Sequence, residues 1–151
     1  VPRVGGFEGG TVTWAPTNIT YGHNNRSAQF RLPQNRYCIE NRAADMMMNV
    51  YLALAMTLSA ANEGIKNKID PGKPTDQDLY QMTDAEFKKL GIRQLPKNLL
   101  QAIEALKKDK LSDEVLGSVM KKSYLSYKND EWERYHQAVT DWEVKEYLRL
   151  Y

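Results

Sequence analysis

The 151-residue sequence predicts an α+β fold, with antiparallel strands in the N-terminal third and a mainly helical region after it. Between Ser27 and Arg42 polar and apolar residues alternate in two runs, and the turn residues Pro33-Gln34-Asn35 separate them. This pattern is typical of an antiparallel hairpin. From about residue 45 onwards, apolar residues recur at helical spacing between residues that cap helices.

The strand region begins with a glycine-rich stretch, residues 4–10, which predicts a loop. Short β-prone runs follow at residues 11–14 and 18–21. In the hairpin, Arg31 lies on the polar face of the first run. Glu40 and Arg42 are two residues apart in the second run, so both should point into the same cavity.

The helical region divides into five expected helices. The first should run from Met46 to Glu63, with Asp45 as its N-cap and Gly64 just after its end. It is apolar almost all round, so we expect it to be buried. The others are a short helix after a Thr83 capping box, ending near Gly91; one from Pro96 through Leu106; a long one from Ser112 towards His136; and one from Asp141 to Tyr151.

Composition excludes several classes of function. The net charge of +2 gives no case for a nucleic-acid or anionic-membrane partner. No apolar stretch reaches the length of a membrane span, and the single cysteine, Cys38, suits a reducing cytosol. No histidine is near Cys38 in sequence, so we do not expect a catalytic thiol. The chain starts without methionine or a signal peptide, which suggests that sequence upstream is missing.

Other polar residues predict ordinary surface roles. His23 and His136 are isolated and lack metal-ligand spacing, and Lys121-Lys122 should belong to a solvated face.

The charges of the strand region are unusual because arginines dominate them. A single acid, Glu40, accompanies four arginines: Arg26, Arg31, Arg36 and Arg42. The rigid guanidinium fork suits carboxylate and phosphate oxygens, which indicates an anion-binding sheet face. The alternative is an exposed polar face with scattered ion pairs.

Three segments in this order resemble the glutamine synthetase family. They are Ala15 to Pro33 with its Asn25-Arg26-Ser27 core; Glu40-Asn41-Arg42 followed by Asp45, Asn49, Tyr51 and Leu52; and Gly64 to Gly72 followed by Asp78-Leu79-Tyr80. The resemblance implies that the chain is the C-terminal part of the family's catalytic domain. Residues 1–44 would be the flap and active-site strands, and residues 45–151 the helical part. The N-terminal β-grasp domain and the rest of the catalytic domain would be absent, so the chain alone should be inactive.

The resemblance also implies a reaction and its residues. Family members use ATP to phosphorylate the glutamate side chain, and an amine then displaces the phosphate. Arg26 and Arg31 match arginines that contact the transferring phosphoryl group and ADP, and Arg42 matches one that contacts glutamate. Glu40 matches a ligand of Mg²⁺ or Mn²⁺, whose other ligands lie upstream in the family. The alternative for Glu40 is a salt bridge to Arg42 or Arg31.

Two departures from the family pattern concern the amine and the metal site. Trp14 replaces an acid on the flap that helps to deprotonate ammonium, and Glu8 lies on the wrong side of an insertion to take over that role. The Trp14 variant resembles the glutamate–methylamine ligase-like branch and favours a small alkylamine, unless Trp14 is only a packed flap residue. Cys38 replaces an arginine found two residues before the metal-binding glutamate, and Arg36 lies further back.

Two alternatives stay open: an ordinary glutamine synthetase that uses ammonia, or a non-catalytic relative. The resemblance implies a cytoplasmic homo-oligomer, a dodecamer when intact, with active sites between subunits. Tyr80 matches a position that some members adenylylate, which we do not expect here.

Overall fold

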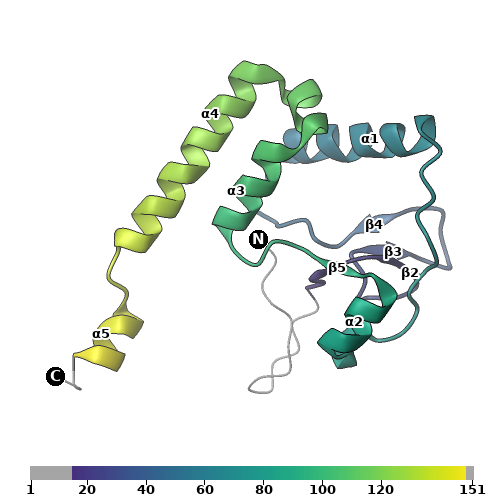
Figure 1. Cartoon of the computed structure of the whole chain (residues 1–151), viewed down its shortest axis with the longest axis horizontal. Helices are drawn as coiled ribbons and strands as arrows, with labels where there is room; N and C mark the ends of the chain where they lie inside the picture. Colours follow the sequence, from purple (N-terminus) through teal and green to yellow (C-terminus); the bar gives the residue numbers. More distant parts are fainter. Residues whose placement is uncertain (1–14, 149–151) are drawn as a thin grey trace. The chain divides into compact units, whose positions relative to one another are not determined.

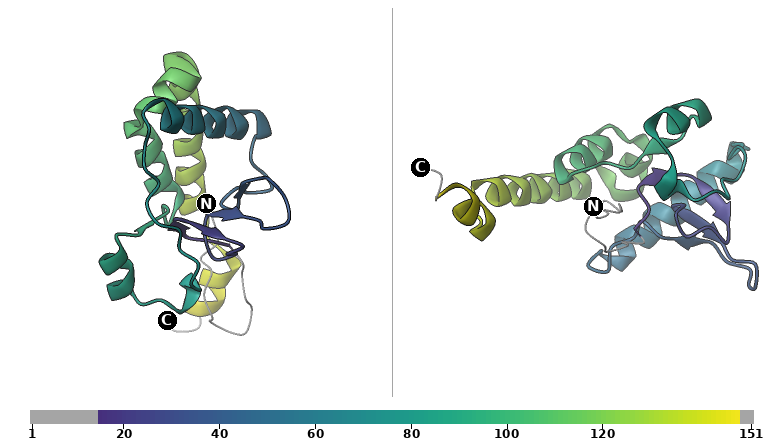
Figure 2. Two further views of the ribbon diagram at one scale, coloured as in Figure 1. Left: turned by 90° about the vertical axis from the view of Figure 1, so that its right-hand side faces the viewer. Right: turned by 90° about the horizontal axis from the view of Figure 1, so that it is seen from below.

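The computed structural model describes residues 15–148, which form short strands in the N-terminal part and mainly helices after it (Figures 1 and 2). The predicted α+β class is therefore confirmed. The chain divides into two compact units, of which the first ends at Asn98 and the second begins at Leu99. The elements are β1 (Asn18–Ile19), β2 (Tyr21–His23), β3 (Phe30–Leu32), β4 (Glu40–Asn41), α1 (Val50–Lys66), the 3₁₀ helix η1 (Leu79–Gln81), α2 (Asp84–Leu90), β5 (Arg93–Gln94), α3 (Leu99–Lys108), α4 (Lys110–Gln137) and α5 (Asp141–Tyr147).

The first unit contains two small sheets. β1 pairs antiparallel with β5, and β3 lies between β2, which is parallel to it, and β4, which is antiparallel. The β3–β4 pair is the predicted hairpin, although only Glu40 and Asn41 of the second run form a strand. Residues 36–39 before them are exposed, so no other described element packs against them to keep them in an extended strand. In the register of this pair Arg31 is opposite Glu40, which places both on one face of the sheet.

The segment of residues 72–79 lies along β2. Its Thr75 N–H donates to the carbonyl of Tyr21 at 2.8 Å, and the Tyr21 hydroxyl donates to the carbonyl of Gly72 at 2.7 Å. Gly22 permits this approach. A Cβ atom at Gly22 would overlap the carbonyl oxygen of Thr75 and lie 2.8 Å from the Cβ of Asn25. The position therefore requires glycine because the two backbones touch.

The Asn25 side-chain amide fastens the 72–79 segment at a second point. Its Nδ2 donates to the carbonyls of Thr75, at 2.7 Å, and Gln77, at 2.9 Å. Its Oδ1 accepts from the backbone N–H and the hydroxyl of Ser27, at 2.9 and 2.7 Å. The buried Ser27 hydroxyl in turn accepts from the N–H of Leu79 at 3.0 Å.

A small apolar core lies behind these hydrogen bonds. Ala28, Leu79 and Phe87 are buried together, with Met82 and Ile92 packed against them. Phe87 belongs to α2, whose predicted capping box is present: Thr83 and Glu86 exchange hydrogen bonds, and Gly91 ends the helix at φ 67°. Leu79 packs in this core with its side chain and donates its backbone N–H to Ser27, so the apolar core and the hydrogen bonds around Asn25 stabilise one another.

Helix α1 corrects two predictions. It begins at Val50 with Asn49, not Asp45, as its N-cap, because the Asp45 carboxylate instead accepts from the N–H of Met47 in a turn. It continues through Gly64 to Lys66.

The expected burial of this helix is also wrong. It contains no buried residue, and Tyr51 and Leu58 are 81% and 67% exposed, because the described residues leave its apolar side chains uncovered. Within residues 15–148, no helix is long and apolar enough to cross a membrane.

In the second unit, α3 and α4 pack side by side (Figure 1). The predicted long helix begins at Lys110, with Asp109 as its N-cap, and bends at Gly117, where φ is 69° and ψ is 162°. Only glycine adopts that backbone conformation readily, so the residue sets the bend. Helix α5 (Asp141–Tyr147) starts at Asp141 as predicted, behind a capping box of Thr140 and Glu143, and its predicted end at Tyr151 lies outside the described residues.

The bend at Gly117 buries Lys121, which was expected on a solvated face. Its ammonium donates to the carbonyls of Lys107, at 3.3 Å, and Asp109, at 2.9 Å, and pairs with the Asp113 carboxylate at 2.6 Å. Lys121 is 5% exposed, whereas the adjacent Lys122 is exposed as predicted. The ammonium therefore closes the turn between α3 and α4.

We predict that Asn25→Asp loosens the 72–79 segment, because a carboxylate would face the carbonyls of Thr75 and Gln77 without a donor. Loss of these two hydrogen bonds costs about 1–3 kcal/mol of local opening free energy. Hydrogen exchange measured on peptides covering residues 72–79 should therefore accelerate. The control is Asn35→Asp in the exposed turn after β3. Equal exchange in the two variants would contradict the role of the Asn25 amide.

We also predict that Lys121→Met lowers thermal stability, because it leaves two carbonyls and a carboxylate without their shared donor. A cost of about 1–3 kcal/mol corresponds to a fall of about 3–10 °C in Tm. Circular dichroism melting provides the measurement. Lys122→Met removes the same charge from an exposed neighbour and should change Tm by no more than about 2 °C. Similar losses in both variants would show that net charge, not the buried contact, matters.

Candidate active site

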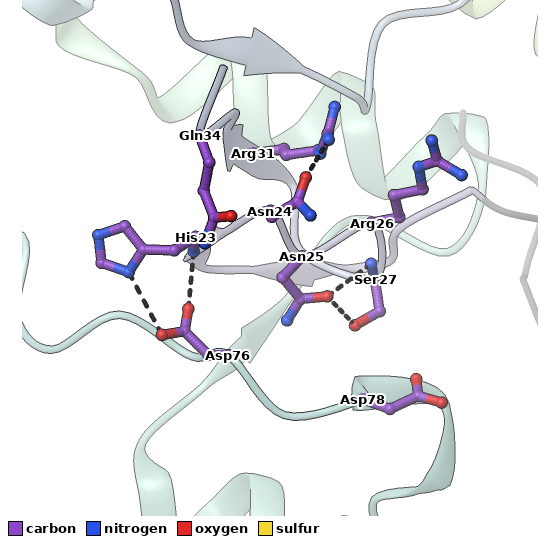
Figure 3. Close-up of a pocket in the computed structure, with 9 residues that line it drawn as sticks. All are labelled: His23, Asn24, Asn25, Arg26, Ser27, Arg31, Gln34, Asp76 and Asp78. Carbon is purple, nitrogen blue, oxygen red and sulfur yellow. Dashed lines mark hydrogen bonds and ion pairs between the residues drawn. The ribbon is translucent and has the colours of Figure 1, made fainter. Parts of the chain in front are cut away.

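A cavity of about 690 Å³ opens beside β2 and β3 (Figure 3). The loop after β2, the turn after β3 and the 72–79 segment complete its walls, so the links made by Asn25 and Gly22 determine its shape. The lining residues are all polar or charged: His23, Asn24, Asn25, Arg26, Ser27, Arg31, Gln34, Asp76 and Asp78. Such a wall suits a polar ligand rather than an apolar one.

Arg31 joins the cavity to β4 by pairing with Glu40. Its Nη1 atom lies 3.1 Å from one Glu40 carboxylate oxygen and 3.0 Å from the other. Its Nη2 atom donates to the Asn24 side-chain carbonyl, the link drawn in Figure 3. The Arg31 side chain is only 15% exposed. The guanidinium is thus held in one orientation, and the salt bridge considered from sequence is present.

A second arginine contacts the same carboxylate. Arg36, four residues before Glu40, reaches one of its oxygens with Nη2 from a side chain that is 60% exposed. Hydrogen bonds from Arg31, and then from Arg36, lower the pKa of Glu40, while desolvation acts in the opposite direction. Glu40 is therefore ionised at neutral pH. Any stability that this lowered pKa contributes is present at neutral pH and is lost as the pH falls through it.

Arg26 differs from these two arginines. It is exposed and lines the cavity, and within residues 15–148 it makes no hydrogen bond or ion pair (Figure 3). Its donors are therefore available to an anion in the cavity.

Arg42, another predicted site residue, does not line the cavity. It follows β4, is partly buried and donates its backbone N–H to the carbonyl of Gln29 at 2.8 Å. Trp14 and Glu8 fall outside the described residues, so their predicted roles stay predictions. Cys38 is exposed and free of a disulfide bond within the described residues.

The described residues do not make a complete metal site by themselves. Within residues 15–148, no three histidine, cysteine, aspartate or glutamate side chains converge as metal ligands would. Glu40 offers one carboxylate, and guanidinium groups occupy it. Mg²⁺ and Mn²⁺ need oxygen ligands from several groups. The metal role of Glu40 stays a prediction, and any further ligands would have to come from other residues.

Sequence reasoning missed the contact between His23 and Asp76. The His23 backbone N–H donates to the Asp76 carboxylate at 2.7 Å, and Nδ1 lies 3.3 Å from its other oxygen. The backbone hydrogen bond is the main cause of the lowered pKa of Asp76. The two residues are far apart in the sequence, and no local pattern connects them. Their contact closes the end of the cavity opposite Arg26 (Figure 3).

Comparisons with known proteins show which family this chain is similar to. A family model described as "Glutamine synthetase, catalytic domain" matches residues 10–147. The chain is 42% identical over 140 residues to a glutamate–methylamine ligase of Methyloversatilis universalis, covering 93% of this chain and 31% of that protein. It is also 42% identical over 139 residues to a glutamine synthetase of Methanosarcina mazei, with 90% and 31% covered.

A solved structure described as a GmaS/ADP complex is similar to this chain. It superposes with a TM-score of 0.81 at 35% identity, covering 97% of this chain and 33% of that one. The chain thus spans about a third of the length of the relatives it matches. Because the family model covers nearly the whole sequence, from residue 10 to residue 147, the chain belongs to the glutamine synthetase catalytic-domain family.

Proposed function

We propose that the intact protein is an ATP-dependent ligase that forms a γ-glutamyl amide from glutamate and an amine, through a γ-glutamyl phosphate. The observation that carries this proposal is the pair of cavity arginines within the family-matched segment: Arg26, which has no hydrogen-bond or ion-pair partner among residues 15–148, and Arg31, which Glu40 holds. The similar solved structure described as a complex with ADP supports a nucleotide as ligand.

The two arginines suit phosphoryl transfer because that reaction depends on positioning and charge neutralisation. Arg31 is fixed by its partners before any ligand arrives, and such preorganised donors stabilise developing charge most effectively. Arg26 contributes a guanidinium that can donate bidentate hydrogen bonds to phosphate oxygens. We assign both residues to the phosphates of ATP and to the transferring phosphoryl group.

Arg42 and Glu40 would contact the other components of the reaction. We assign Arg42 to the substrate glutamate, whose carboxylates match its fork. Glu40 would supply one oxygen ligand to Mg²⁺ or Mn²⁺, and such an ion neutralises charge on phosphoryl oxygens when bound. Both roles rest on the family match of the Glu40-Asn41-Arg42 segment. We further propose that the protein is a cytoplasmic homo-oligomer, a dodecamer as in the family.

The most specific part of the proposal is the identity of the amine that reacts. The methylamine ligase and the glutamine synthetase relatives are equally identical to this chain, so identity does not separate methylamine from ammonia. Trp14 favours an alkylamine, because an indole cannot accept a proton from ammonium but can offer an apolar wall and a cation–π face. Ordinary glutamine synthetase activity is the second candidate.

We predict that Arg26→Ala lowers kcat/KM for ATP at least about tenfold, or about 1.4 kcal/mol, with little change in Tm. Arg26 is exposed and makes no hydrogen bond or ion pair with other described residues, so its loss should not disturb the fold. Arg93→Ala, in exposed strand β5, removes the same charge elsewhere and serves as the control. Steady-state assays of the full-length protein test this. Normal ATP kinetics in Arg26→Ala would remove the residue from the nucleotide site.

We predict that the full-length enzyme uses methylamine more efficiently than ammonia. Removing one methyl group from water contributes about 0.8 kcal/mol, which alone gives a preference of a few-fold. The measurement is kcat/KM for ammonia, methylamine and ethylamine at one pH, corrected for the fraction of free amine. Trp14→Glu should shift selectivity towards ammonia. Better use of ammonia by the unmodified enzyme would instead identify an ordinary glutamine synthetase.

A further inference from the structure

Asn24 holds the Arg31 guanidinium on the side of the cavity. Its side-chain carbonyl accepts a hydrogen bond from Nη2 of Arg31, whereas the Glu40 carboxylate accepts from Nη1. Asn24 and Arg31 both line the cavity, and Glu40 does not (Figure 3). Within residues 15–148, Nη2 has no other hydrogen-bond partner. Without Asn24, the planar guanidinium would therefore be held at one nitrogen only, and it could turn about that contact.

The backbone of Asn24 is built for this contact. Its φ angle is 51°, in the left-handed region, and its N–H donates to the carbonyl of Leu32 at 2.8 Å. That hydrogen bond joins the loop after β2 to the end of β3, the strand that carries Arg31. Glycine adopts the left-handed conformation most readily, and asparagine is among the few other residues that tolerate it. Glycine would therefore suit the backbone, and what asparagine adds is the side-chain acceptor.

We propose that Asn24 is a positioning residue for phosphoryl transfer, which fixes the orientation of the Arg31 guanidinium in the cavity. This inference rests on the proposed function, in which Arg31 contacts the transferring phosphoryl group. Donors that are oriented before charge develops stabilise the transition state most effectively. A misdirected guanidinium still attracts the charge of ATP, so Asn24 affects kcat more than it affects the KM for ATP.

The test is a double-mutant cycle in the full-length protein, with Asn24→Gly, Arg31→Ala and the double variant. Asn24→Gly should lower kcat about tenfold while the KM for ATP changes by less than about twofold. In the Arg31→Ala background, the same substitution should change kcat by less than about twofold, because no guanidinium remains to be oriented. Steady-state rates are expressed per folded molecule, with the folded fraction measured by circular dichroism.

Lys68→Gly is the control for placing glycine at a left-handed position. Lys68 has a φ of 50°, is exposed and does not line the cavity. Its replacement by glycine should leave kcat and the KM for ATP as they are in the unmodified protein. The same result is expected for Asn24→Gly if the Asn24 side chain has no role beyond its backbone conformation.

Normal kcat in Asn24→Gly would therefore overturn the inference. A tenfold loss that is the same with and without Arg31 would also overturn it, because Asn24 would then act independently of that guanidinium. The single variant Arg31→Ala separates these failures from that of the proposed function. If Arg31→Ala turns over normally, the role assigned to Arg31 is wrong and the inference fails with it. If Arg31→Ala is impaired and Asn24→Gly is not, only the inference is wrong.

Discussion

The close contact between β2 and the 72–79 segment is the constraint on which the candidate site depends. Gly22 lets the two backbones touch, and the Asn25 amide uses both of its ends, donating to Thr75 and Gln77 and accepting from Ser27. These contacts bring a distant part of the chain to the edge of the small sheet. Without them, one wall of the cavity would have no fixed position, and Asp76 would not lie beside His23.

Charge is distributed unevenly around that cavity. One end carries Arg26 and Arg31, and only Arg31 is neutralised by a carboxylate of the described chain. The other end carries Asp76, which is held by the backbone and the ring of His23. An anion is therefore favoured at the arginine end and disfavoured at the aspartate end. A second carboxylate, that of Asp78, also lines the cavity, so the Arg26 guanidinium marks one favourable position for an anion rather than a uniformly positive end.

Local patterns predicted the local structure of this chain well. Alternation predicted the β3–β4 hairpin and therefore the face that Arg31 and Glu40 share, and the Thr83 capping box predicted the start of α2. The failures need information from distant residues. Nothing near Asn25 in sequence indicates that its amide reaches Thr75, and Gly117 looked compatible with a continuous helix. The burial of α1 was inferred from composition, which cannot supply a covering layer.

The two interpretations of Glu40, a salt bridge and a metal ligand, need not exclude one another. A carboxylate that is three-quarters shielded from water requires a positive partner. Within the described residues that partner is guanidinium, and the Arg31 hydrogen bond is the largest single cause of the lowered pKa of Glu40. The lowered pKa keeps the carboxylate ionised, which is also the form that binds a cation. Arg31 and Arg36 therefore hold Glu40 in its ionised form, which is the form that the proposed metal role requires.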